Sequence, residues 1–501
     1  MINNFTMKTN LKKCFSFFLI ATSLLITKAV AQSVQPKGIY AVIAIDNYGV
    51  YDTNYVNQII ANPAVCGLTI REQWRNVEPT EGNYDFSRID AAVSRATLLN
   101  KTIQLIIVPG FYTPDWVLSQ IDSCESFLTN PDTIPAPCGK LKMIVPYGND
   151  GDDTLWFPLP WNSLYKQKWQ NFLNAMAQKY NGNSTVVSIA LGGPTSVSCE
   201  MTMPEWWKYW KWQNILKLFY PLGDQHRNSN LAFVEEWKNS IQLYDQVFVN
   251  KSIIVTMANA LISFPSYSSE AARDTILEYF KNVNYLNNFK GTQTSGLMAC
   301  HDYPNDVEKV KELTLHNIKG GAQFAMPVYS FPNEMGCDSC GGTPCTGIAP
   351  DSAIRKVLAV FFDSTSCGNT FGNGTIGNYQ LNYLQVYAPD INYANSNSTA
   401  QSLFIAASNC LNGCITTNVQ EKNDNIENVL VYPNPFSNSV SLQFPANNYK
   451  IKIVDVIGNV VIEKTLNSKL ETLNLNLPNG VYFLQVKGDN FIQTKKLEVI
   501  K

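Results

Sequence analysis

Histidine is scarce in this chain, and its scarcity removes several classes of site. Only His226, His301 and His316 occur among 501 residues. Catalytic zinc sites usually take two or three ligands from histidine, so multi-histidine metal centres and HExxH peptidases are excluded. No G-x-S-x-G string marks a hydrolase nucleophile elbow. We therefore expect no metal and no cofactor.

The chain also lacks an excess of charge of either sign. Lysine and arginine total 38 against 40 aspartate and glutamate residues, which gives a formal net charge of −2. No basic run stands out apart from the pair Lys12-Lys13. Nucleic-acid binding therefore has no electrostatic footprint. A G-x-G-x-x-G string at 372–377 follows no predicted strand and opens no predicted helix, so it does not indicate a dinucleotide site.

Apolar runs long enough to span a bilayer are lacking as well. The longest candidate, residues 15–27, is too short and belongs to a secretory leader. Lys8, Lys12 and Lys13 precede it, and Ala29-Val30-Ala31 forms a small-x-small cleavage pattern at the end of residues 1–31. We expect an exported protein without a transmembrane segment, and we expect it to be a monomer.

Cysteine is present twelve times, and Cys14 lies in the leader. Cysteines in the loops of an exported protein usually pair as disulfides. The loop cysteines are Cys124, Cys138, Cys337, Cys340, Cys345, Cys367, Cys410 and Cys414. A zinc site formed by the four cysteines between 337 and 367 is the alternative. Cys66 and Cys300 lie at or inside apolar strands, which predicts buried thiols. The odd count of eleven mature cysteines predicts at least one free thiol or one intermolecular bond.

Apolar runs and amphipathic helical patterns alternate along most of the chain. The predicted strands are residues 39–45, 67–70, 103–108, 186–191, 253–257, 296–300, 323–328 and 383–387. The predicted helices are residues 54–61, 87–99, 164–180, 231–247, 268–285, 306–315, 351–362 and 400–411. Most strands are continuous apolar runs, typical of a parallel sheet buried on both faces. The alternation predicts an α/β fold, a (β/α)8 TIM barrel over residues 32–415, with its functional groups at the C-terminal ends of the strands.

The segment 67–116 resembles the front of the retaining (β/α)8 glycoside hydrolases, such as the β-galactosidases and cellulases. Arg71 ends a predicted strand, Trp74 follows it, and a Glu-Pro-x-x-Gly-x-Tyr-x-Phe loop runs from Glu78 to Phe86. The resemblance implies a secreted enzyme that cleaves the β-glycosidic bonds of an oligosaccharide or polysaccharide by double displacement. That reaction needs two carboxyl groups about 5–5.5 Å apart.

In the resembling families a glutamate after the fourth strand is the acid/base and a glutamate after the seventh is the nucleophile. The first carboxylates after those predicted strands are Glu200 and Glu334. Both lie several residues beyond the strand ends, and Cys199 precedes Glu200 where the families usually have asparagine. The substitutes, in order, are Glu205, Asp302 and Asp115.

Further residues are expected to bind the substrate. The resemblance implies that Arg71 keeps the nucleophile ionised and that His301 and Tyr303 approach it. Among the aromatic residues near strand ends, Trp74, Trp116 and Trp161 are candidate sugar-stacking platforms, and Asn259 is a candidate for holding a sugar hydroxyl. A structural salt bridge from Arg71 to Glu72 or Glu78 stays open, as does a purely structural role for His301.

The last part of the chain changes character. Residues 416–428 are polar and charged, typical of a linker, and residues 429–501 show short alternating strands, which predicts a small immunoglobulin-like β-sandwich. The motifs YPNPF at 432–436 and PNGVY at 478–482, with Lys495-Lys496 near the end, resemble the sorting domain of the bacterial type IX secretion system. The resemblance implies that the secretion machinery is a partner and that the protein is released or held at the outer-membrane surface.

Two other functions compete with hydrolysis. The displaced positions of Glu200 and Glu334 leave room for a catalytically inactive barrel that binds glycans at the cell surface. A structural or adhesive protein is the third possibility. The sugar, the linkage and the choice between endo and exo cleavage are not encoded in any motif that we recognise.

Overall fold

The structure is a computed structural model, and its chain separates into two compact units, residues 1–415 and 416–501. It describes residues 35–44, 53–145, 153–283, 289–299, 304–316, 318–337, 345–362, 381–411, 413–414, 429–444, 449–455, 459–487 and 492–500. Each unit is considered by itself.

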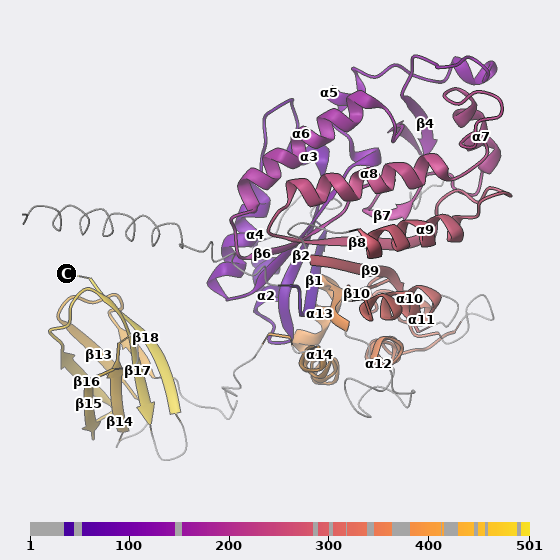
Figure 1. The fold of residues 1–501 in the computed structure, drawn as a ribbon. Coiled ribbons are helices and arrows are strands. Elements are labelled where there is room, and N and C mark those ends of the chain that lie inside the picture. Colours follow the sequence, from indigo (N-terminus) through magenta and orange to yellow (C-terminus); the bar gives the residue numbers. More distant parts are fainter. Residues whose placement is uncertain are drawn as a thin grey trace, which may run out of the picture. The chain divides into compact units, whose positions relative to one another are not determined.

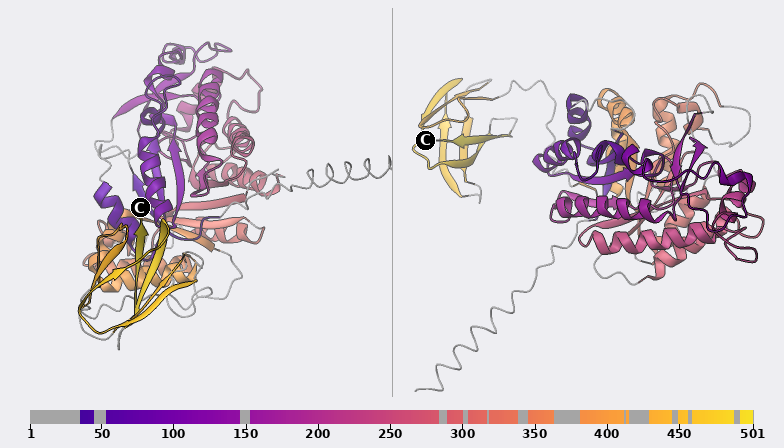
Figure 2. Two further views of the ribbon diagram at one scale, coloured as in Figure 1. Left: turned by 90° about the vertical axis from the view of Figure 1, so that its left-hand side faces the viewer. Right: turned by 90° about the horizontal axis from the view of Figure 1, so that it is seen from above.

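Eight of the nine strands in the largest sheet are parallel neighbours that close into a barrel (Figures 1 and 2). They are β1 (Gly38–Ala44), β2 (Val65–Gln73), β3 (Thr102–Val108), β6 (Val186–Ala190), β8 (Ser252–Ala260), β9 (Phe289–Leu297), β10 (Lys319–Phe324) and β11 (Leu381–Tyr387). Pairing of β11 with β1 and of β6 with β8 completes the ring. The predicted TIM barrel is therefore confirmed.

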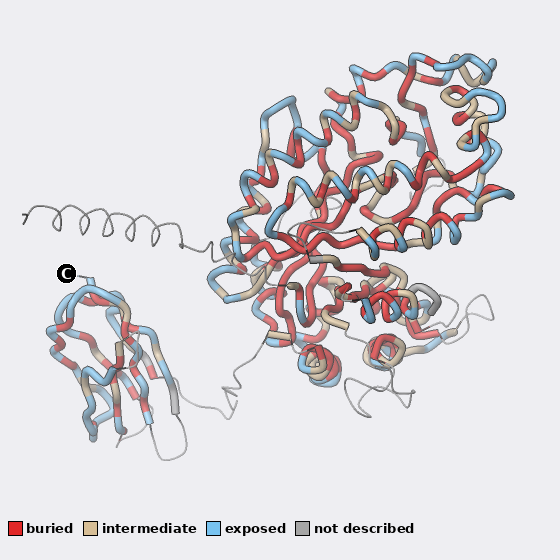
Figure 3. The backbone as a smooth tube through the Cα atoms, in the orientation of Figure 1, coloured by how far each residue is buried: buried red, intermediate tan, exposed pale blue. Residues whose placement is uncertain are grey.

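Helices follow the strands and cover the outside of the barrel. They are α2 (Thr53–Ala61), α4 (Ser87–Leu98), α6 (Ser163–Tyr180), α8 (Leu231–Val247), α9 (Ser269–Asn282), α10 (Pro304–Thr314), α12 (Pro350–Phe362) and α14 (Ser398–Cys410). Figure 3 shows buried strands inside helices whose outer faces are exposed. The amphipathic pattern of these helices, with apolar residues three and four apart, forms the seam between helix and sheet.

The connections at the C-terminal ends of the strands carry additional short elements. These are α3 (Trp74–Val77), η1 (Gly110–Tyr112), α5 (Asp115–Leu118), η2 (Phe127–Thr129), the hairpin of β4 (Lys140–Ile144) and β5 (Thr154–Pro158), β7 (Glu200–Thr202), α7 (Tyr209–Lys217), α11 (Pro332–Met335) and α13 (Ala388–Ser396). The longest of these connections, between β3 and α6, is the one for which the sequence predicted an insertion.

The lowest layer inside the barrel pairs large residues with glycines. Tyr40, Ile254 and Tyr383 form a separate apolar cluster. A Cβ at Gly67 would lie 2.4 Å from the Tyr40 ring, and one at Gly321 would lie 2.2 Å from the Tyr383 ring. Any larger residue at these two glycines would displace a tyrosine, so the packing requires them.

The next layer is a buried network of amide side chains. Gln104 Oε1 accepts from Thr69 Oγ1 at 2.8 Å and from Gln385 Nε2 at 3.1 Å. Gln293 Nε2 donates to Gln385 Oε1 at 3.0 Å, and Tyr383 donates to Gln293 Oε1 at 3.1 Å. Because the side-chain period of a strand is two residues, Gly67, Thr69 and Arg71 of β2 point inward in succession, and Arg71 reaches the mouth.

Two of the predicted strands are displaced from the observed ones. The strand predicted at 296–300 is β9, which ends at Leu297, and the strand predicted at 323–328 is β10, which ends at Phe324. Both predictions followed apolar runs. The true strands, FKGTQTSGL and KGGAQF, are rich in glycine, threonine and glutamine because their inward residues fill the layers just described.

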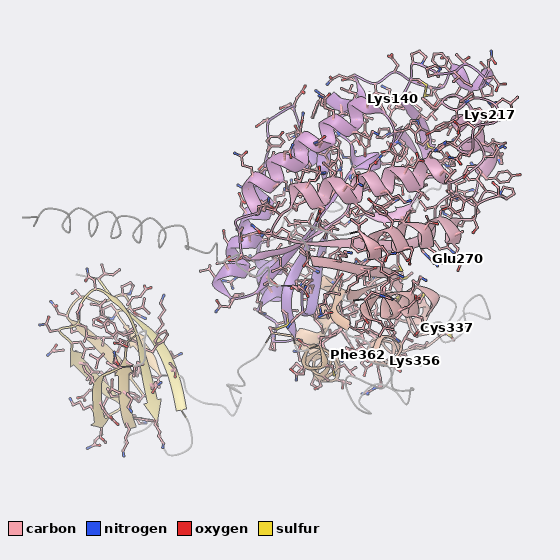
Figure 4. All side chains as sticks on the ribbon, in the orientation of Figure 1. Lys140, Lys217, Glu270, Cys337, Lys356 and Phe362 are labelled. Carbon is pink, nitrogen blue, oxygen red and sulfur yellow. A yellow bond between two sulfur atoms is a disulfide. The ribbon has the colours of Figure 1, made fainter. Side chains whose placement is uncertain are left out.

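Disulfides fix several connections. Cys66 at the start of β2 bonds to Cys414, across 348 residues, so the prediction that Cys66 is a thiol was wrong. Cys124 bonds to Cys138, and Cys337 bonds to Cys345. The last pair takes two sulfurs from the proposed zinc cluster; Cys340 and Cys367 lie outside the described residues, as does Cys300. Figure 4 marks Cys337 beside α12, where Lys356 Nζ donates to the carbonyl oxygen of Gly336 at 3.2 Å. Cys199 is a buried free thiol.

The C-terminal unit consists of two antiparallel sheets. One contains β12 (Leu430–Tyr432), β13 (Ser439–Gln443) and β16 (Leu470–Asn474), and the other β14 (Tyr449–Val454), β15 (Val460–Leu466), β17 (Gly480–Lys487) and β18 (Ile492–Val499). Val440 and Leu442 of the first sheet share an apolar core with Ile451 and Leu484 of the second. The predicted all-β sandwich is confirmed.

Candidate active site at the barrel mouth

Arg71 and Glu200 interact at the C-terminal mouth of the barrel. Nη2 of Arg71 donates to the carbonyl oxygen of Val197 at 2.7 Å. Burial raises the pKa of Glu200 above its ordinary value, and a hydrogen bond with Ser295, the charge of Arg71 and a hydrogen bond with Ser198 oppose the rise only in part. A glutamate that retains its proton beside a fixed positive charge has the protonation state required of a general acid.

The short strand β7 explains how Glu200 reaches the mouth although it lies ten residues beyond β6. Glu200 pairs with Thr256 of β8 and Thr202 pairs with Ala260, so β7 extends the sheet above the barrel rim. Ser198 accepts the Glu200 backbone N–H at 3.1 Å. The Cys199 thiol donates to the carbonyl oxygen of Ile107 at 3.3 Å, which holds the loop against β3.

Tyr387 and Ser295 complete this group, and the sequence reasoning had not singled out either. Burial raises the pKa of Tyr387 to about 12, with Arg71 lowering it and Glu200 raising it. Gln323 Nε2 donates to the Tyr387 hydroxyl at 2.9 Å, so the phenolic hydrogen is directed elsewhere. The available signal was position, since Tyr387 ends a strand as Arg71 does. Ser295 was hidden by the displaced sixth strand.

Glu334 lies apart from these contacts. It is an exposed residue of α11, which is tied to the segment after β9 by a hydrogen bond from the Ala299 N–H to the Met335 carbonyl oxygen, 2.9 Å long. Within the described part of the chain, the Glu334 carboxylate makes no hydrogen bond or ion pair. Its role as a nucleophile therefore stays a prediction.

The substitute carboxylates differ in their surroundings. Glu205 is buried and accepts from Lys208 at 2.8 Å, from Lys211 at 2.5 Å and from the backbone N–H of Ile144 at 3.3 Å. Those donors keep its pKa below the ordinary value even though burial opposes them. Asp115 is exposed on α5, and Asp302 lies outside the described residues.

The acidic residues near Arg71 have partners of their own. Glu72 accepts from Asn76 at 2.7 Å and pairs with Arg88 at 3.4 Å. Glu78 accepts from Trp74 Nε1 at 2.8 Å and from the Gly82 N–H at 2.9 Å. Glu78 thus closes the turn of the Glu-Pro-x-x-Gly loop, where Gly82 adopts a positive φ of 72° that favours glycine.

The three predicted stacking tryptophans pack against other rings. Trp74 is 0% exposed and lies 4.9 Å from the Trp169 ring, so it presents no face to a ligand and serves the core. Trp116 is half-buried and donates to the Glu78 carbonyl oxygen at 3.0 Å. Trp161 is half-buried, 5.5 Å from Phe219 and 5.8 Å from Phe233.

The remaining predicted residues are placed as follows. Asn259 is exposed at the C-terminal end of β8, on the side of the barrel mouth. His301 and Tyr303 lie outside the described residues.

A set of exposed aromatic residues that the sequence reasoning missed lies just beyond β7. Trp207 is 51% exposed, Tyr209 42% and Trp210 56%. The segment that carries them is anchored by Glu205 and by Trp212, whose Nε1 donates to the Pro204 carbonyl oxygen at 2.9 Å. A firmly held segment thus presents three rings to solvent. Their alternation with lysines, in WWKYWKWQ, was the signal.

The described residues contain no group of three or more histidine, cysteine, aspartate or glutamate side chains that could hold a metal ion. In the same part of the chain, no helix is both long enough and apolar enough to cross a bilayer.

Comparison with known proteins identifies the tail of the chain. Residues 430–501 match the family model of the secretion system C-terminal sorting domain. This domain directs the protein to secretion or to attachment at the outer-membrane surface, as predicted. No curated protein sequence matches the chain.

Solved structures give distant similarities. PorZ of the type-IX secretion system of Porphyromonas gingivalis is 22% identical, with a TM-score of 0.14, over 15% of this chain and 11% of its own. Bacteroides uniformis beta-glucuronidase 2, as a calcium-binding mutant, is 8% identical with a TM-score of 0.34, over 93% and 46%. The beta-galactosidase of Marinomonas ef1 is 10% identical with a TM-score of 0.39, over 74% and 59%. This chain therefore spans less than two thirds of each.

Proposed function

We propose that this protein is an exported glycoside hydrolase that cleaves β-glycosidic bonds of a polysaccharide or oligosaccharide. The observation that carries the proposal is Glu200, a carboxyl group at the mouth of a TIM barrel whose pKa is raised by burial while Arg71 lies close enough to act on it. Active sites of TIM barrels are built at this face. The sorting domain agrees with a substrate that is met outside the cell.

In the proposed reaction Glu200 donates its proton to the glycosidic oxygen as the bond to the anomeric carbon breaks. A second carboxylate attacks that carbon and forms a glycosyl ester, and Glu334 is the proposed nucleophile. Glu200, now ionised, then takes a proton from the water that cleaves the ester and is restored. Tyr387, with its hydroxyl already accepting from Gln323, is placed to donate a hydrogen bond toward the same space.

A second candidate function is a barrel that binds glycans without cleaving them. The observation in its favour is the position of Glu334, exposed and without a polar partner among the described residues. In addition, the loop that follows β6 has no carboxylate before Glu200, and the segment 325–333 after β10 has none before Glu334. Double displacement needs two carboxyl groups about 5–5.5 Å apart, and inversion tolerates about 6.5–9.5 Å.

The test is hydrolysis of aryl β-glycosides and a polysaccharide panel by the wild type, Glu200→Gln and Glu334→Gln. Glu270→Gln is the matched control for Glu334, since both glutamates are exposed in the first turn of a helix. Loss of activity in both variants but not in the control supports the enzyme with both roles. Activity that survives in Glu334→Gln assigns the nucleophile to another residue. Glycan binding without hydrolysis by any of the proteins favours the second function.

A further inference from the structure

A pocket separate from the barrel mouth lies between α6 and α8. It has a volume of about 330 Å³, at the lower end of the range for ligand sites. Helix α6 contributes Lys166, Trp169 and Gln170, helix α8 contributes Glu236, Asn239 and Gln246, and the loop after β6 contributes Gly192, Gly193, Pro194 and Thr195. Figure 1 shows the two helices running side by side on the outside of the barrel.

The lining is polar but carries no unbalanced charge. Lys166 Nζ pairs with Glu236 Oε1 at 2.8 Å, so the two charged residues neutralise each other. Amide groups of Gln170 and Asn239 supply donors and acceptors on both sides. The Trp169 ring adds an apolar surface. Paired hydrogen-bonding edges next to an aromatic ring match a neutral ligand that has hydroxyl groups and C–H faces.

Thr195 provides an independent indication of a ligand. It lines the pocket, it is 2% exposed, and its Oγ1 has no hydrogen-bond partner among the described residues. A buried hydroxyl without a partner costs free energy, because it has given up its hydrogen bonds to water. A hydroxyl group of a bound ligand would restore the missing hydrogen bond.

The loop that forms the base of the pocket also supports the barrel mouth. The Ser196 carbonyl oxygen accepts from the Phe111 N–H at 3.0 Å, and the Val197 carbonyl oxygen accepts from Arg71. Two residues further on, the backbone N–H of Glu200 is bonded to Ser198. The pocket and the mouth therefore lie on opposite sides of one loop.

We propose that the pocket between α6 and α8 binds a small neutral sugar, a monosaccharide or disaccharide, through Thr195, Gln170 and Asn239. This site is additional to the barrel mouth, and its occupancy does not depend on whether the protein hydrolyses glycosides. A ligand seated there would contact the loop that positions Arg71 and Glu200.

The experiment measures binding of neutral mono- and disaccharides to the full chain by calorimetry, for the wild type and for Thr195→Val, Gln170→Ala and Glu200→Gln. Thr195→Val should weaken binding about tenfold, the usual effect of one lost hydrogen bond within a small site. It should leave the melting temperature unchanged or raised, because the hydroxyl that it removes has no partner. Gln167→Ala is the matched control for Gln170→Ala, since both amides are exposed on α6 and only Gln170 lines the pocket.

The proposal is supported if Thr195→Val and Gln170→Ala weaken binding while Gln167→Ala and Glu200→Gln do not. Binding that is lost in Glu200→Gln and kept in the two pocket variants places the sugar in the barrel mouth and overturns the proposal. Absence of binding for every sugar in the panel overturns it as well, and the pocket then holds water only. Neither negative result bears on hydrolysis, which is measured separately.

Discussion

The side chain of Arg71 and the backbone of Val197 are joined by a hydrogen bond of 2.7 Å, although 126 residues separate them. The bond links the end of β2 to the loop that leads into β7, and it thereby fixes the guanidinium relative to Glu200. An arginine held in this way contributes both a charge and a defined orientation. Substitutions at Arg71 should therefore separate these two contributions.

We expect Arg71→Gln to shift the pH dependence of hydrolysis. The general acid must be protonated, so activity should fall by about tenfold per pH unit above the pKa of Glu200. Arg71 lowers that pKa, so its removal raises it further, and the alkaline limb of the profile should move to higher pH. The control Arg71→Lys keeps the charge and should leave the limb nearly in place while kcat falls. A limb that stays fixed in Arg71→Gln would contradict the assignment of Glu200 as the acid.

The exposed rings of Trp207 and Trp210 yield a prediction about polymer substrates. We expect the double variant Trp207→Ala/Trp210→Ala to lose binding to insoluble polysaccharide by about tenfold or more, since each stacking ring contributes about 1 kcal/mol. Hydrolysis of an aryl glycoside should change little, because the rings lie beyond β7 rather than at Glu200. Tyr432→Ala, which removes an exposed ring of the C-terminal unit, is the control. Equal losses on the polymer and on the aryl glycoside would show that the variants disturb the barrel mouth instead.

The architecture of the barrel was predictable because most of its strands are uninterrupted apolar runs and its helices are amphipathic. Strands β1, β3, β8 and β11 lie within two residues of the predicted starts. The prediction failed at β9 and β10 because their inward residues are glycine, glutamine and threonine. Such residues resemble a loop in the sequence, and only the neighbouring tyrosines explain why glycine is needed there.

The candidate site was harder to predict than the fold. Arg71 and Glu200 could be named because each follows a recognisable strand. Ser295 and Tyr387 could not, since their proximity arises from closure of the ring between β9 and β11 and from the way β7 folds back. Trp74 was assigned to sugar binding from its place in the motif. In the folded chain it is enclosed by Trp169 and Phe172, contacts that depend on a helix almost one hundred residues away.

The disulfide Cys66–Cys414 joins the second strand to the end of the barrel unit, and its removal should be costly. We expect Cys66→Ser/Cys414→Ser to lower the free energy of unfolding by about 2–5 kcal/mol, because the bond closes a loop of 348 residues in the unfolded chain. The pair Cys337→Ser/Cys345→Ser opens a loop of only 8 residues and should cost less. Chemical denaturation of the two variants checks this order. The reverse order would indicate that native contacts outweigh chain entropy here.

Asp390 leads to a prediction about pH and stability. It is fully buried at the start of α13, its Oδ1 accepts from the Tyr329 N–H at 2.8 Å, and its Oδ2 has no hydrogen-bond partner among the described residues. Burial raises its pKa to about 7, against the opposing effect of backbone hydrogen bonds from Tyr329, Tyr387 and Val328. The folded protein therefore keeps this proton at pH values where the unfolded chain has released it.

The sign of the effect follows from linkage. A group whose pKa is raised by folding stabilises the native state fully at low pH and loses that contribution as the pH rises from about 4 to about 7. Asp390→Asn keeps an acceptor for Tyr329 and does not ionise, so its unfolding free energy should gain on the wild type by up to roughly 4 kcal/mol over that interval, at 1.36 kcal/mol per pKa unit. Urea unfolding at pH 4, 5.5, 7 and 8, chosen to bracket about this range, measures the difference. The exposed Asp115→Asn should give a curve parallel to the wild type, and a parallel curve for Asp390→Asn would mean that Asp390 is already ionised well below pH 7.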